Sequence, residues 1–78
     1  MTRTKNKAIE PITMQSVSAF IYEFERNTGD APSVSEICAH FGVLDRGMVI
    51  KSARAGVAAG LLWQDERRRG RYRAVKHD

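Results

Sequence analysis

Five arginines lie within seven residues near the C-terminal end of the chain, and they are Arg67, Arg68, Arg69, Arg71 and Arg73. Guanidinium groups at this density repel one another unless anions neutralise them. The adjacent Asp65 and Glu66 can offset only part of the charge. A guanidinium presents a planar fork of donors that matches phosphate oxygens, so the cluster predicts contact with the backbone or minor groove of DNA. The alternative is a solvated, cationic turn.

A second pair of cations, Lys51 and Arg54, is three residues apart, which places both side chains on one face of a helix. These two residues could clamp a phosphate or contact guanine, and the alternative is a solvated helix face. The neighbouring Met48 and Ile50 could contact thymine methyl groups, bind a protein or belong to the core.

The sequence offers little for catalysis or metal binding. One cysteine, Cys38, and two histidines, His40 and His77, make no zinc-binding pattern, and no nucleophile with a base or glycine-rich phosphate loop is present. We therefore expect no enzyme activity, no cofactor and no metal, with Cys38 as a buried structural thiol. The absence of a long apolar run and of a cysteine framework favours a cytoplasmic protein without a membrane partner.

The charge is distributed unevenly along the 78 residues, whose formal net charge is +4. Residues 8–45 hold one basic and six acidic side chains, a balance of −5, whereas residues 46–76 hold nine basic and two acidic ones, a balance of +7. This polarity is typical of a nucleic-acid-binding domain. A cationic surface that serves only solubility is the alternative.

These candidate groups must be positioned by helices and a hairpin. Residues 1–10 lack apolar periodicity, so we expect a flexible basic arm that contacts DNA through Arg3, Lys5 and Lys7. Residues 11–78 then form one domain. Its first helix spans about 11–27, because the apolar residues there recur at helical spacing, at Val17, Phe20, Ile21 and Phe24.

Capping signals place two further helices. Ser33 and Glu36 form a capping box, so a second, short helix starts there and stops at Gly42. Asp45 can cap a third helix through residue 59, with a core-facing ridge of Val49, Ala53 and Val57. The glycine that follows, Gly60, closes it.

Two strands around the arginine-rich turn, at 61–66 and 71–75, predict a C-terminal β-hairpin. We expect Arg71 and Arg73 to share one face of this hairpin, and Trp63 to pack beside Tyr72 across it. The predicted fold class is mainly α with a small β-hairpin.

The run from Thr28 to Ile37 has a glycine, a proline, a small capping residue and then Glu-Ile, and it resembles the start of the winged helix-turn-helix in LexA-type repressors. The similarity extends over roughly residues 13–75, through Gly42, Gly60, Leu61-Leu62 and Arg69-Gly70. It implies a three-helix winged helix-turn-helix whose wing touches the flanking DNA backbone. By this resemblance the third helix lies in the major groove and carries Arg46, Gly47, Met48, Ile50, Lys51 and Arg54.

The chain departs from that family in two ways. It has no room for the second, self-cleaving domain of full-length LexA-type repressors, so no serine-lysine protease activity carries over. Its third helix also offers few hydrogen-bonding side chains for reading bases. We predict a small, repressor-like transcriptional regulator that binds double-stranded DNA. The alternative is a protein-interaction module that uses the apolar face of the third helix and the basic wing.

One helix and one wing read only a few base pairs. Useful affinity would therefore need a dimer, neighbouring copies along DNA or a larger protein partner.

Overall fold

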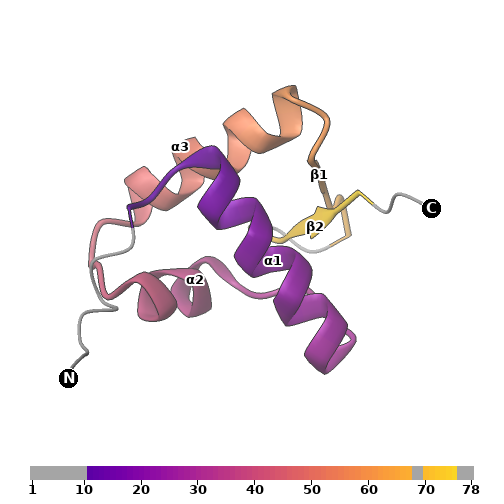
Figure 1. Ribbon diagram of the computed structural model, residues 1–78, viewed down its shortest axis with the longest axis horizontal. Helices are drawn as coiled ribbons and strands as arrows, with labels where there is room; N and C mark the ends of the chain where they lie inside the picture. The colour runs from indigo at the N-terminus through magenta and orange to yellow at the C-terminus, as the bar shows by residue number, and fades with distance from the viewer. Residues whose placement is uncertain (1–10, 68–69, 76–78) are drawn as a thin grey trace, which may run out of the picture.

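The computed structural model describes residues 11–67 and 70–75, and the predicted arm with Arg3, Lys5 and Lys7 lies outside the described residues. The chain forms three helices and a two-stranded antiparallel sheet, which confirms the mainly helical class with a small hairpin. The elements are α1 (Met14–Thr28), α2 (Val34–Phe41), α3 (Arg46–Ala58), β1 (Leu62–Gln64) and β2 (Tyr72–Ala74) (Figure 1). None of the described helices has the length and apolarity to cross a bilayer.

Side-chain caps set where each helix begins. The predicted capping box opens α2, because the Glu36 amide donates to Ser33 Oγ at 3.1 Å and the Ser33 amide donates to Glu36 Oε1 at 2.8 Å. Asp45 caps α3 as expected, accepting from the Met48 amide at 3.3 Å. The first helix begins three residues later than the expected start at residue 11, because Thr13 is its cap and forms a reciprocal box with Ser16.

The core lies where the three helices meet the hairpin. Its fully buried side chains include Val17 and Ile21 of α1, Ile37 of α2 and Val49 of α3. Cys38 is buried on the core side of α2, as predicted for a structural thiol. Burial of these apolar side chains is the main favourable term that holds the helices in place.

One glycine of α3 is required by this packing. A Cβ built on Gly56 would lie 2.8 Å from Leu62 Cδ1 and 2.9 Å from Ser18 Oγ. The missing side chain therefore lets α3 pack directly on α1 and β1. Such close packing compensates for the conformational cost of a glycine inside a helix.

The hairpin register separates two aromatics that were expected to pack together. Trp63 pairs with Arg73, and Gln64 pairs with Tyr72. Successive side chains of a strand point to opposite faces, so Trp63 and Tyr72 lie on different faces of the sheet. Tyr72 is 3% exposed and belongs to the core, whereas Trp63 is 47% exposed. The predicted Trp63–Tyr72 contact is therefore wrong.

Candidate nucleic-acid interface

The helix α3 has one buried and one open side. Val49, Ala53 and Gly56 are buried against the rest of the fold. Four of the predicted DNA-binding residues are exposed on the other side, and they are Gly47, Met48, Lys51 and Arg54. Ile50 differs from them, because it is half-buried and packs against the core cluster. A ligand on the open side would therefore meet two cations, one thioether and bare backbone at Gly47.

Arg46, the first residue of α3, is exposed but makes a hydrogen bond within the protein. Its Nη1 donates to Ser35 Oγ of α2 at 2.9 Å. This exposed hydrogen bond joins the first turns of two consecutive helices, α2 and α3. Arg46 thus has an internal partner that the sequence did not predict.

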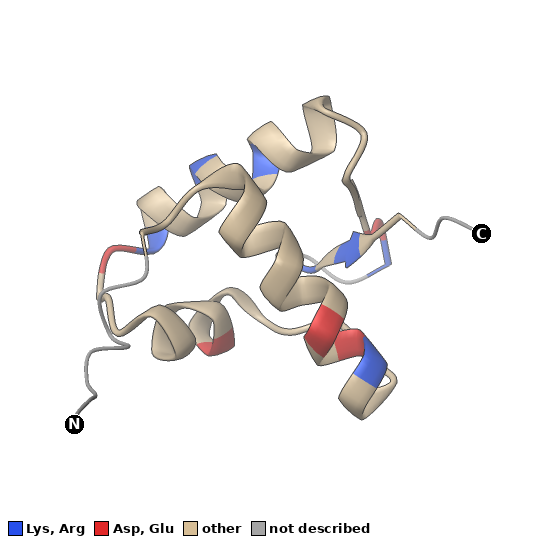
Figure 2. Ribbon diagram, in the orientation of Figure 1, with Lys and Arg blue, Asp and Glu red and all other residues tan. Residues whose placement is uncertain are grey.

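Lys51 and Arg54 have no such internal role. Within the described part of the chain, neither side chain makes a hydrogen bond or an ion pair. The acidic residues of α1 do not lie beside them. Figure 2 shows basic positions spaced along α3, whereas the acidic residues of α1 gather toward the C-terminal end of that helix. The open side of α3 therefore presents positive charge that no described protein group neutralises.

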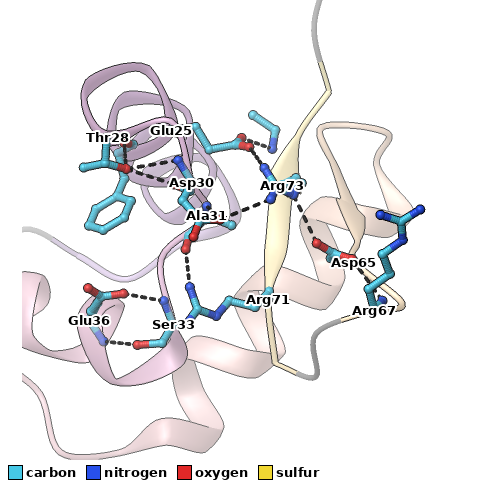
Figure 3. Close-up of polar contacts among 12 residues, drawn as sticks. Glu25, Thr28, Asp30, Ala31, Ser33, Glu36, Asp65, Arg67, Arg71 and Arg73 are labelled. Carbon is cyan, nitrogen blue, oxygen red and sulfur yellow. Dashed lines mark hydrogen bonds and ion pairs between the residues drawn. The ribbon is translucent and has the colours of Figure 1, made fainter.

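Arg73 is held by three carboxylates, and these four residues form what we call the Arg73 cluster. The guanidinium contacts Glu25 Oε2 through Nη1 at 2.8 Å, Asp30 Oδ1 through Nη2 at 3.1 Å and Asp65 Oδ2 through Nε at 3.2 Å (Figure 3). Hydrogen bonds to Asp65 and then to Glu25 raise the pKa of Arg73 above its ordinary value, against a smaller opposing effect of burial. All the guanidinium nitrogens are engaged within the protein.

Arg71 is also directed inward. Its Nη1 donates to the carbonyl oxygen of Ala31, in the segment that joins α1 to α2. Figure 3 shows Arg73 of β2 and Arg71, the residue just before β2, extending to the same side, so the prediction that they share a face is confirmed. That face is turned toward α1 and the connection after it. We therefore remove both arginines from the expected set of DNA contacts.

One carboxylate of the Arg73 cluster, Glu25, also binds the backbone of β2. Glu25 Oε1 accepts from the Ala74 amide at 2.8 Å, so one carboxylate of α1 holds both a side chain and the main chain of β2. The sequence carried a signal for this arrangement, since the charge balance of residues 8–45 is acidic. Local sequence patterns could not predict the pair, because Glu25 is 48 residues from Arg73 in the chain.

The turn between β1 and β2 holds one exposed arginine among its described residues. The Arg67 amide donates to Asp65 Oδ1 at 3.0 Å, which fixes the start of the turn. The Arg67 side chain is exposed (Figure 3). Arg68 and Arg69 lie outside the described residues.

Other chemistry has little support in the described residues. No group of three histidine, cysteine or carboxylate side chains there could hold a metal ion. His40 stacks on Phe20 with ring centroids 4.1 Å apart, so its ring contributes to packing between α1 and α2. Comparison of the chain with protein-family models, with curated proteins and with solved structures finds no match.

Proposed function

We propose that this chain is a winged helix-turn-helix domain that binds double-stranded DNA, with α3 in the major groove and the turn between β1 and β2 acting as the wing. The observation that carries the proposal is the open face of α3, where Lys51 and Arg54 are exposed and have no ion pair within the described residues. Phosphates are the anions that such a face would meet on a duplex. In this proposal the domain serves as a small transcriptional regulator.

The basic residues divide into two groups in this proposal. Arg71 and Arg73 hold the hairpin in place, whereas Lys51, Arg54 and Arg67 are available for phosphate oxygens. The other proposed phosphate contacts lie outside the described residues: they are Arg3, Lys5, Lys7, Arg68 and Arg69. Phosphate contacts of this kind fix the orientation of a domain on DNA and supply affinity that depends on salt.

Replacing both Lys51 and Arg54 with alanine is expected to weaken duplex binding by about ten-fold or more near 0.1 M salt. Each lost phosphate contact should reduce the slope of log K against log salt concentration by about 0.9, so the double variant should lose about two units. Fluorescence anisotropy with a labelled duplex, measured at several salt concentrations between about 50 and 200 mM, gives both quantities.

Arg26→Ala is the matched control, because Arg26 is an exposed arginine near the end of α1 whose i,i+3 partner is Glu23. It changes the net charge without touching α3, so its salt slope should remain that of the wild type. The proposal is wrong if the wild-type chain does not bind duplex DNA at low salt. It is also wrong if the double variant keeps the full slope.

A further inference from the structure

Two large apolar side chains are exposed at the start of α3. Leu44, in the connection from α2, is 99% exposed, and Met48, in the first turn of α3, is 49% exposed. The adjacent Val49 is fully buried, so an apolar side chain at this end of α3 can reach the core, whereas Leu44 and Met48 remain exposed. A leucine with nearly its whole surface in water contributes nothing to the core, and it is available for an external contact.

Met48 adjoins the cationic face, and Leu44 lies one residue before Asp45, the cap of α3. Met48, Lys51 and Arg54 follow one another at three-residue intervals, which makes them neighbours in one row on the open side of α3. Asp45 accepts a hydrogen bond from the Met48 amide and thereby fixes where this row starts. Gly47 has no side chain to shield the backbone between Leu44 and Met48. A ligand that contacts Lys51 would therefore reach Met48, and Leu44 is the exposed apolar residue just before the helix.

We infer that Leu44 and Met48 contact the 5-methyl groups of thymines in the major groove, an inference that rests on the proposed DNA binding. Thymine presents the one apolar group on the major-groove edges of the four bases. A leucine or methionine placed against a polar base edge would strip water from it without replacing the hydrogen bond, which is unfavourable. The same contact with a methyl group is favourable. The leading end of α3 thus selects methylated pyrimidines by apolar contact.

The surroundings favour DNA over a protein as the occupant. Stable protein interfaces need a contiguous apolar centre contributed by many residues. Here the apolar group comprises two side chains, and the residues between and beside them are Asp45, Arg46 and Gly47. The positive charge that continues along the row through Lys51 and Arg54 complements phosphates on both sides of a groove.

The test compares an AT-rich duplex with the same duplex in which deoxyuridine replaces every thymidine. The phosphates are unchanged and only the methyl groups are lost. Burying one methyl group favours binding by about four-fold, so two contacted methyl groups predict about 15-fold tighter binding of the thymine duplex by the wild type. The double variant Leu44→Ser, Met48→Ser should bind both duplexes equally and keep the wild-type salt slope.

A second pair of duplexes, GC-rich and differing only in 5-methylation of cytosine, gives an independent measure. The wild type should prefer the methylated duplex and the double variant should not. Because Leu44 and Met48 are exposed, the variant should keep the thermal midpoint of the wild type, and circular dichroism checks this.

Equal wild-type binding to the thymine and uracil duplexes, with a normal salt slope, overturns the inference and leaves the proposed function intact. Absence of binding to every duplex overturns both. If light scattering shows a wild-type dimer that Leu44→Ser converts to a monomer, without any methyl preference, the apolar pair is a contact between copies of the chain and the inference is wrong.

Discussion

Replacing Arg73 with methionine should lower the free energy of unfolding by about 2 to 4 kcal/mol. Methionine fills similar space but leaves Glu25 and Asp65 close together without their common cation, and their side chains are only 15% and 10% exposed. Removing one partner of a buried ion pair costs more than the pair itself contributes, because the remaining charge stays desolvated. The side chain of Arg73 is 24% exposed, which moderates the loss.

A domain of 78 residues has a total stability of roughly 4 to 12 kcal/mol, so this one change removes a large fraction of it. Urea unfolding followed by circular dichroism measures the difference. Arg54→Met is the matched control: it removes an arginine from the same chain, but one without an internal partner among the described residues. That control should unfold within about 0.5 kcal/mol of the wild type and should lose DNA affinity instead.

The pH dependence of the Arg73 effect follows from the direction of its pKa shift. A cation whose pKa is raised in the folded state contributes stability fully at any pH below its ordinary value, and that contribution is lost only as the pH rises through the raised value. The difference in stability between the wild type and Arg73→Met should therefore be the same at pH 7 and pH 9. A difference that shrinks over this interval would show that another group carries the effect.

Gly56→Val should destabilise the fold by about 3 kcal/mol, at the upper end of what overpacking a core usually costs. The new Cβ alone would lie within 3.0 Å of both Leu62 Cδ1 and Ser18 Oγ, and both residues are buried. Relief of that contact requires α3 to move away from α1 and β1. Thermal unfolding should show a lower midpoint, and the exposed area of the native state should rise.

Gly47→Ala serves as the comparison, since Gly47 belongs to the same helix but is exposed. Its Cβ would meet one atom, Asp45 Oδ1 at 3.3 Å, on a side chain that is itself exposed. We expect a change in stability below about 1 kcal/mol, because the helix propensity of alanine offsets the adjustment of the cap. Similar effects of the two substitutions would contradict the assignment of Gly56 to the packing of α3.

The sequence predicted what short-range interactions determine. Ser33 with Glu36, and Asp45 before α3, fixed two helix starts correctly because capping depends on residues three positions apart. The start of α1 was placed too early, since serine at the third position of a capping box is a weaker signal than glutamate. The ridge of Val49 and Ala53 was also correct, because helical periodicity defines a buried face.

The candidate site was predictable only in part, and Arg71 and Arg73 of the hairpin show why. Alternation along β2 placed Arg71 and Arg73 on one face, but it could not say whether that face meets water or another element. The answer depends on Glu25 and Asp30, which the fold brings in from the other half of the chain. The Trp63 error has a similar origin: a shift of one residue in hairpin register moves a side chain to the opposite face.

The Arg73 cluster also bears on how such a sequence can change over evolutionary time. Positions 25, 30, 65 and 73 carry charges that balance one another, so a substitution at Arg73 is tolerated only when its carboxylate partners also change, and the four positions should vary together among descendants of one ancestor. Lys51 and Arg54 have no internal partner among the described residues, so the fold does not constrain their identity. A lineage could therefore change the open face of α3 while the hairpin stays anchored to α1.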